Sequence, residues 1–268
     1  MFIDLHTHSE YSFDSKSKLC DMIASAKEND IGVLAVTDHC ELDRVERDNL
    51  LVTMPASADN IRSMQENAGI KLLCGIEVGQ AVWNLETAEK ILSMREYDMV
   101  IGSVHCIRGK GDFYDMNADA FSDEEFLAAM TQYYDELLEL ANWGKFDTLA
   151  HLTYPYRYCD LEKRGGMAFA DRFDEKVNEL FSILIAKKKA LEFNTKSYRH
   201  EDGVELKLFK KYLRMFKEAG GEYLTFGSDA HTPDRIGMYR EKAIPVIKEY
   251  GFDAVTYFEN RKPVQVKL

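Results

Sequence analysis

Residues 2–9 have the sequence FIDLHTHS, an apolar run that ends in two histidines separated by a single residue. The run predicts a short β-strand. In a strand, residues i and i+2 point to the same face, so we expect His6 and His8 to project side by side. Two such imidazoles can chelate a metal ion, whereas a lone histidine usually satisfies local hydrogen bonds. The pair alone is weak evidence for a metal site, and this interpretation depends on finding further ligands elsewhere in the chain.

Apolar runs of this kind recur along the chain and alternate with amphipathic segments. The predicted strands are residues 2–6, 33–39, 71–79, 99–105, 147–152, 190–195 and 223–231. Helical periodicity covers, for example, residues 18–30, 58–68, 123–143, 173–189 and 205–220. A strand followed by a helix about seven times predicts a parallel α/β sheet closed into a barrel. No linker or proline-rich break interrupts the pattern, so we expect one domain over residues 1–268.

The composition narrows the class of protein. The 268 residues are 46% hydrophobic, which is enough for a sizeable core, and contain no apolar run long enough for a membrane span. The start of the chain lacks the features of a secretory signal. Acidic residues outnumber basic ones by 46 to 34, and the formal charge of −12 argues against a protein that binds duplex nucleic acid. A phosphorylated substrate remains compatible, because bound cations reverse the local field.

Five cysteines are dispersed along the chain without a C-x-x-C pair. An odd, scattered set does not predict a disulfide framework, so we expect a reducing, cytoplasmic location. Cys40 and Cys106 each follow a histidine and are expected to be small buried apolar residues.

Polar residues gather where the predicted strands end. In barrel enzymes the carboxyl-terminal rim holds the active site, because the loops after the strands converge there. Six of the seven histidines fall at these ends or just beyond, and only His200 does not. This concentration strengthens the metal-site interpretation of His6 and His8. The residues at the ends are Asp4, His6, Asp38, His39, Glu77, His105, His151, Asn194, Asp229 and His231.

The motifs at these ends resemble those of the PHP superfamily, the polymerase and histidinol-phosphatase metal-dependent phosphoesterases. The resemblance implies a distorted (β/α)₇ barrel. Residues 191–195 and 257–263 resemble the stand-alone histidinol-phosphatase branch. The matching motifs, in the order of the family, are DLHTHS (4–9), TDH (37–39), GIE (75–77), SVH (103–105), AHL (150–152) and GSDAH (227–231).

The resemblance further implies two or three divalent metal ions, zinc, manganese or iron, at the rim. One ion would take His6, His8, Glu77 and Asp229, a second would share Glu77 and add His105 and His151, and a third would take Asp14, His39 and His231. Many relatives have histidine at position 14. The aspartate found here is a competent oxygen ligand that favours Mn²⁺ or Fe²⁺ over Zn²⁺.

Metal ions of this kind suit the hydrolysis of phosphate monoesters, which is extremely slow without a catalyst. Clustered cations lower the pKa of water and neutralise charge on the phosphoryl oxygens, and a carboxylate such as Glu77 can bridge two of them. The working hypothesis is in-line attack by a metal-bridging hydroxide. The leaving alkoxide takes its proton from a water on the third metal or from Asp229, and the sequence leaves this choice open.

Two arginines are candidates for contacts to the phosphate. Arg157 and Arg199 lie in loops that open onto the predicted active face, and the planar guanidinium suits bidentate phosphate binding. Lys196 is a weaker candidate. The alternative is that each arginine makes an ordinary surface ion pair.

Some roles stay open at the level of sequence. Asp4 and Asp38 flank the ligands and either orient imidazoles or cap turns. The aromatic segment 154–158 either lines the substrate pocket or packs its own loop. Residues 108–111 are interpreted as a flexible lid. Glu41, Asp43 and Asp160 lie in suitable loops for the cationic part of histidinol, but none is assigned.

The leading functional hypothesis is hydrolysis of L-histidinol phosphate to L-histidinol and phosphate in histidine biosynthesis, and its substrate rests on the resemblance alone. One alternative is another phosphoesterase or a phosphodiesterase acting on nucleic-acid ends, which the acidic composition disfavours. A second is a catalytically silent metal-binding domain, which is disfavoured because all nine positions hold competent ligands. We expect a small phosphorylated substrate, no nucleic-acid partner and no membrane association, and the oligomeric state stays open.

Overall fold

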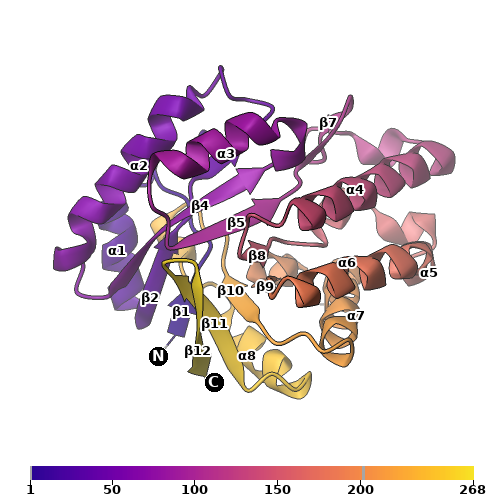
Figure 1. Cartoon of the computed structure of the whole chain (residues 1–268). Coiled ribbons are helices and arrows are strands. Elements are labelled where there is room, and N and C mark those ends of the chain that lie inside the picture. The colour runs from indigo at the N-terminus through magenta and orange to yellow at the C-terminus, as the bar shows by residue number, and fades with distance from the viewer. Residues whose placement is uncertain (1, 201–202) are drawn as a thin grey trace.

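A parallel β-barrel forms the centre of the computed structural model, which describes residues 2–200 and 203–268 (Figure 1). All seven predicted strands are confirmed. Both faces of these strands are buried, which explains why they appear in the sequence as nearly continuous apolar runs. In barrel order they are β1 (Phe2–Asp4), β2 (Ile31–Val36), β4 (Lys71–Gly79), β5 (Met99–Ser103), β8 (Thr148–Leu149), β9 (Ala190–Asn194) and β10 (Leu224–Gly227).

Backbone hydrogen bonds join the last strand to the first. Leu5 N donates to Phe226 O at 2.9 Å, and Asp229 N donates to His6 O at 2.8 Å. The short strand β3 (His39–Glu41) pairs with the end of β4, and its register places His39 directly beside Glu77. The strand ends that carry ionisable residues are therefore brought together at one rim.

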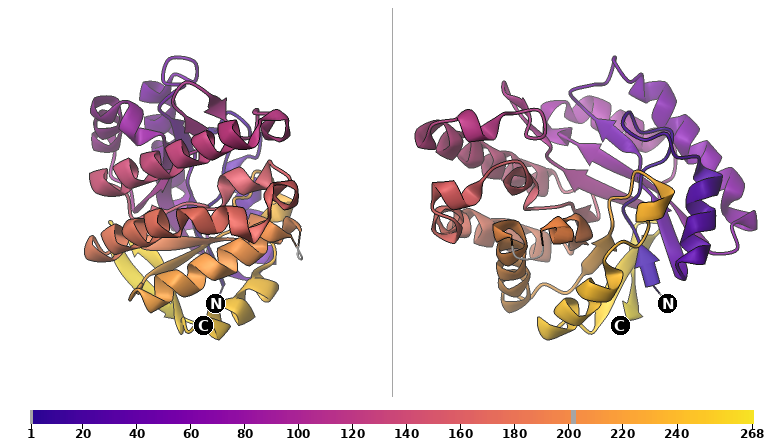
Figure 2. Two further views of the ribbon diagram at one scale, coloured as in Figure 1. Left: turned by 90° about the vertical axis from the view of Figure 1, so that its right-hand side faces the viewer. Right: turned by 180° about the vertical axis from the view of Figure 1, so that it is seen from behind.

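Helices form an outer layer around the barrel (Figure 2). The predicted helix at 58–68 is longer than expected and begins at Leu50, with Pro55 inside it. None of the helices in the described ranges is both long and apolar enough to span a membrane. The helices are α1 (Leu19–Glu28), α2 (Leu50–Met64), α3 (Leu85–Met94), α4 (Asp123–Trp143), α5 (Met167–Ala170), α6 (Asp174–Ala186), α7 (Val204–Glu218) and α8 (Arg240–Glu249).

A β-hairpin, β11 (Ala254–Glu259) and β12 (Lys262–Lys267), lies at the opposite end of the barrel from the rim (Figure 1). Its turn residues Asn260 and Arg261 both have positive φ, as a two-residue hairpin turn with the right twist requires. The tip contacts the start of β5, where Arg261 N donates to Asp98 O at 2.8 Å.

The hairpin tip also reaches a buried carboxylate before β8. The Arg261 guanidinium pairs with Asp147 through Nε and donates to Lys145 O at 2.9 Å through Nη2. Asp147 additionally accepts a hydrogen bond from Val100 N at 2.8 Å. The hairpin thus ties together the beginnings of neighbouring barrel strands.

Candidate metal and phosphate site

All nine predicted ligands lie at the carboxyl-terminal rim. His6 and His8 follow β1, and Asp14 lies in the loop beyond them. His39 and Glu77 belong to paired strands. The remaining ligands follow β5, β8 and β10: His105, His151, Asp229 and His231.

Glu77 is the centre of the site. It is fully buried, and both of its carboxylate oxygens face imidazole nitrogens. This surrounds one carboxylate with five histidines, an arrangement that suits a ligand shared by two metal ions. His39 faces the carboxylate through Nδ1, at 3.0 Å. The other four face it through Nε2, at 3.1 Å for His151, 3.2 Å for His6, 3.4 Å for His105 and 3.7 Å for His8.

Hydrogen bonds at Nδ1 hold the first two histidines. His6 Nδ1 lies 2.5 Å from Glu192 Oε1, and His8 Nδ1 lies 3.2 Å from Ser12 Oγ. The Nε2 atoms of both rings consequently point toward Glu77. Imidazoles that bind metals are usually held in this way, through the nitrogen that does not face the ion.

Glu41 performs the same task for two histidines at once. One oxygen, Oε1, lies 2.9 Å from His39 Nδ1 and 3.0 Å from His105 Nδ1. The carboxylate is 2% exposed and packs over Gly79, where a Cβ would overlap it. Neither Glu41 nor Glu192 was assigned a role from the sequence.

Asp14 and His231 form the outer edge of the cluster. Asp14 Oδ2 lies 3.0 Å from His231 Nε2 and 3.7 Å from His39 Nε2. The Asp14 side chain is 37% exposed, so this edge is much more open to water than Glu77.

The donor atoms of the cluster suit divalent cations. His6 Nε2, His8 Nε2 and Glu77 Oε2 are buried and have no hydrogen-bond partner among the described residues. A polar atom left in this state is costly unless a ligand satisfies it. Mixed imidazole and carboxylate donors suit zinc, manganese or iron. Four groups have donor atoms within 4.8 Å of one another: His6–His8–Glu77, His6–His151–Asp229, His8–His39–His231 and His39–Glu41–Glu77–His105.

Strong electrostatic coupling accompanies this packing. Burial alone would lower the pKa of His39, but Glu77 and Glu41 raise it to about 10. Burial would raise the pKa of Glu41, yet His105 and His39 lower it to about 2. By contrast, burial and the neighbouring His39 and His231 lower the pKa of His8 well below its usual value.

Asp229 adopts a left-handed backbone conformation, with φ of 55°, that non-glycine residues rarely use. Its Oδ1 lies 2.9 Å from Lys196 Nζ and 3.5 Å from His8 Nε2. Burial opposes ionisation, but Lys196 and the imidazoles outweigh it and lower the pKa of Asp229 well below its usual value. Strain of this kind is typical of functional sites.

The two aspartates with open roles differ. Asp38 accepts a hydrogen bond from Ser12 Oγ at 2.9 Å, and Ser12 contacts His8, so Asp38 supports this imidazole indirectly. Asp4 instead accepts from Ser228 N at 2.9 Å and Gly237 N at 2.7 Å, which holds the loop that carries Asp229.

Arg157 is the buried cation of the site. It ends the short 3-10 helix η4 (Tyr154–Arg157), and its side chain is 4% exposed. Nε donates to Glu205 Oε1 at 2.7 Å, and Nη2 donates to Asn194 Oδ1 at 2.9 Å. Nη1 has no hydrogen-bond partner within the described residues and lies 3.7 Å from Asp229 Oδ2. One edge of the guanidinium is therefore directed at the metal cluster.

Arg199 occupies a more peripheral position than Arg157. It is exposed and lines a hollow of about 420 Å³ together with Lys196, Asp229, His231 and Arg235. This hollow opens beside the ligand cluster and is rich in cationic side chains.

The aromatic segment serves both of the roles considered for it. The centroid of the Tyr154 ring lies 4.9 Å from that of His105 and 5.1 Å from that of His151, so the ring borders the site. Tyr156 instead points inward and contacts the Tyr134 hydroxyl at 3.2 Å. The interpreted lid, residues 108–111, comprises the turn between strands β6 (Cys106–Ile107) and β7 (Gly111–Asp112) together with the first residue of β7.

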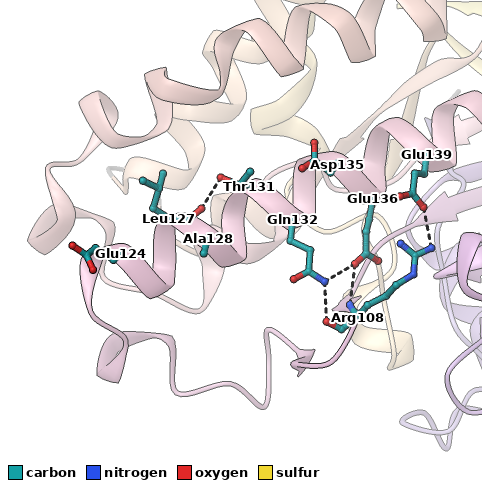
Figure 3. Close-up of a pocket in the computed structure, with 9 residues that line it drawn as sticks. All are labelled: Arg108, Glu124, Leu127, Ala128, Thr131, Gln132, Asp135, Glu136 and Glu139. Atoms are coloured by element: carbon teal, nitrogen blue, oxygen red, sulfur yellow. Dashed lines mark hydrogen bonds and ion pairs between the residues drawn. The ribbon is translucent and has the colours of Figure 1, made fainter.

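A second hollow, of about 520 Å³, lies along the outer face of α4 (Figure 3). Several of its polar groups are paired with one another. Arg108 N donates to Glu136 Oε1 at 2.9 Å, and the Arg108 guanidinium donates to Glu139 Oε2 at 2.9 Å. None of the buried polar atoms that lack a partner in the described part of the chain belongs to a residue lining this hollow.

Comparison with known proteins agrees with this geometry. Across 97% of its length the chain is 25% identical to a probable histidinol-phosphatase of Clostridium acetobutylicum, covering 98% of that protein. It is 27% identical to a histidinol-phosphatase of Lactococcus lactis over 97% of the chain and 95% of the relative. A crystal structure of the histidinol phosphate phosphatase from Lactococcus lactis, complexed with zinc, L-histidinol and phosphate, has the same fold. It covers 98% of both chains with a TM-score of 0.80 and 23% identity.

The family assignment rests on the motifs that build the rim. The model of the PHP domain matches residues 4–196, which include seven of the nine predicted rim ligands, from His6 to His151. The match covers well over half of the chain, and the strand order and rim geometry are those that the motifs predict. The chain belongs to the PHP domain family.

Proposed function

We propose that this protein is a metal-dependent phosphatase that hydrolyses L-histidinol phosphate to L-histidinol and inorganic phosphate. The observation that carries the proposal is the convergence of buried, unpartnered Nε2 and carboxylate atoms on Glu77, with the outer ring nitrogens already held by other side chains. The curated relatives that span nearly the whole chain bear the name of this activity and support the choice of substrate.

Divalent ions held by the nine ligands would supply the water activation and charge neutralisation that monoester hydrolysis needs. Glu77 is suited to bridge two of them, because its two oxygens face different histidines. Asp14 would complete an outer position with His39 and His231, and its oxygen donor favours Mn²⁺ or Fe²⁺ there.

The chain's own cations would bind the phosphate. Arg157 Nη1 is buried, unpartnered within the described chain and close to Asp229, so it is placed to donate to a phosphoryl oxygen beside the metal cluster. Arg199 would act farther out, where the hollow opens to solvent. Lys196 holds the Asp229 carboxylate through Oδ1 and keeps it oriented as a ligand.

The test is phosphate release from L-histidinol phosphate by purified protein before and after chelation, with metal content measured in parallel. We expect two or three metal ions per chain, loss of activity on chelation, and recovery on adding Zn²⁺, Mn²⁺ or Fe²⁺. Bound metal without turnover of histidinol phosphate would show that the substrate assignment is wrong. The substrate would then be sought by assaying a panel of phosphoesters that includes a diester. A chain that binds no metal would overturn the whole proposal.

A further inference from the structure

We propose that Asn194 is a positioning residue that orients the Arg157 guanidinium toward the phosphate, and that Glu192 anchors Asn194 to the metal ligand His6. The inference rests on the proposed function, because it concerns how the same site binds a phosphoryl group. It adds a role for two buried side chains on β9 that are not among the nine predicted ligands and do not line the open hollow.

The guanidinium of Arg157 needs such orientation. An arginine side chain has many rotamers, and only one rotation of the group turns Nη1 toward Asp229 while Nη2 and Nε face the protein. Fixing that rotation in advance removes an entropic cost from phosphate binding. Glu205 contacts the guanidinium at Nε. This single contact would by itself leave the end of the Arg157 side chain freer to rotate.

Asn194 supplies the second point of attachment. Its Oδ1 accepts from Arg157 Nη2 at 2.9 Å and from Lys196 N at 3.1 Å. Its Nδ2 donates to Glu192 Oε2 at 3.1 Å, which defines which side of the amide faces the arginine. The side chain is 1% exposed, so water does not substitute for these partners.

Glu192 is the junction between the phosphate-binding and metal-binding halves of the site. Oε2 accepts from His151 N at 2.7 Å as well as from Asn194, and Oε1 lies 2.5 Å from His6 Nδ1. A Cβ at Gly227 would overlap both Glu192 Oε1 and the His6 side chain, so the close packing requires glycine there. His6, Glu192, Asn194 and Arg157 therefore form one continuous chain of hydrogen bonds.

The experiment is a double-mutant cycle with Asn194→Leu, Arg157→Ala and the combined variant, each prepared with its metals. Titration calorimetry measures the Kd of inorganic phosphate, and metal content and thermal unfolding are recorded for every variant. We expect Asn194→Leu to weaken phosphate binding by about tenfold, the loss typical of a misplaced charge-assisted contact. In the Arg157→Ala background the same change should alter the Kd by less than about twofold, because Asn194 acts through Arg157.

Two results would overturn the positioning role. An equal loss in both backgrounds would show that Asn194 acts independently of Arg157, and an unchanged Kd in the single variant would show that it does not act on phosphate at all. Failure of the proposed function has a different signature, since then the unsubstituted, metal-loaded protein would neither bind phosphate nor release it from a monoester.

Controls separate positioning from folding. Asn178→Leu, on the exposed face of α6, makes the same chemical change away from the site and should leave the phosphate Kd unaltered. If Asn194→Leu does not fold, Asn194→Ser keeps a polar side chain too short to reach Arg157 and takes its place in the cycle. A loss of phosphate affinity that follows metal content across the variants, rather than the presence of Arg157, would also contradict the inference.

Discussion

The two ends of the barrel use buried carboxylates for opposite purposes. At the amino-terminal end, Asp98 and Asp147 accept hydrogen bonds from strand N–H groups and from the turn of the β11–β12 hairpin. At the rim, Glu77 is buried just as deeply, yet its neighbours are imidazoles, and Oε2 has no hydrogen-bond partner among the described residues. The two carboxylates at the hairpin end have hydrogen-bond partners within the described residues, whereas the carboxylate at the rim is placed to bind a ligand.

The comparison implies a separation of stability from activity. Buried polar groups that are fully hydrogen-bonded hold a fold together, whereas groups left unsatisfied usually mark a functional site. Substitutions at the hairpin end should therefore change the free energy of unfolding and spare the activity of each folded molecule. Substitutions at the rim should lower the activity of each folded molecule and largely spare the free energy of unfolding.

The largest effect is expected at Glu77. Glu77→Gln removes the carboxylate that faces five imidazoles, so we expect phosphatase activity to fall by on the order of a thousandfold. Metal content should drop by at least one ion per chain, because an amide is a poor bridging ligand. Metal analysis and steady-state phosphate release measure both effects. A variant with full metal content and near-normal activity would contradict the assignment of Glu77 as the bridge.

The opposite end is tested by Arg261→Ala. The substitution leaves Asp147 buried without its guanidinium, and because Arg261 is itself 36% exposed we expect a loss of about 2–3 kcal/mol in unfolding free energy. Activity per folded molecule should not change. Urea denaturation measures the loss, and Gln265→Ala on the exposed part of β12 is the matched control.

The loss of unfolding free energy in Arg261→Ala should depend on pH in a defined direction. Burial raises the pKa of Asp147, and Arg261 opposes that rise. Without Arg261 the folded-state pKa lies further above the unfolded value, so the charged carboxylate penalises folding most at neutral pH. The deficit should shrink as the pH falls through the folded-state pKa and the carboxyl group is protonated. A deficit that grew toward acidic pH would contradict this account of the hairpin.

A smaller effect is expected for Glu41→Gln. A neutral amide holds the Nδ1–H groups of His39 and His105 less strongly than a carboxylate, so metal affinity should fall about 10–100-fold. Activity should largely return at saturating metal, which distinguishes a supporting partner from a ligand. Competition with a chelator measures the affinity, and Glu46→Gln, an exposed glutamate nearby, serves as the control.

The smallest effect is expected at the open edge of the rim. Asp14→Ala removes a half-exposed carboxylate that contacts only His231 and His39 within the cluster, so activity should fall about fivefold or less. Metal analysis should show loss of one ion and retention of the others. Loss of all bound metal would mean that the outer position organises the inner ones.

Much of the fold could be predicted because the barrel strands are buried on both faces and stand out as apolar runs. The β11–β12 hairpin did not stand out, since four of the six residues of β12 are exposed and its turn, 259–262, is charged. The start of α2 was missed because its apolar first turns contain Pro55, which breaks the helical pattern.

The site divides in the same way. Its candidate ligands, apart from Asp14, could be predicted to lie together because they sit at or just beyond strand ends, a position that the local pattern reveals; their role as metal ligands stays a prediction. Glu192 and Glu41 could not be assigned, because each contacts a histidine far away in the sequence, at separations of 186 residues to His6 and 64 residues to His105, and these contacts depend on how the strands are ordered around the barrel. A signal for Glu192 was nevertheless present, since it is a single charge inside the apolar strand β9.

The shared oxygen of Glu41 has an evolutionary consequence. Because one atom serves both His39 and His105, a change at any of these three positions disturbs two ligands, and we expect the three to be inherited as a unit among homologues. Among the described residues Asp14 contacts His231 and His39 and otherwise faces water, so we expect its identity to vary between carboxylate and imidazole among homologues. The tolerance of that single position would let a lineage exchange one metal for another while the rest of the rim stays constant.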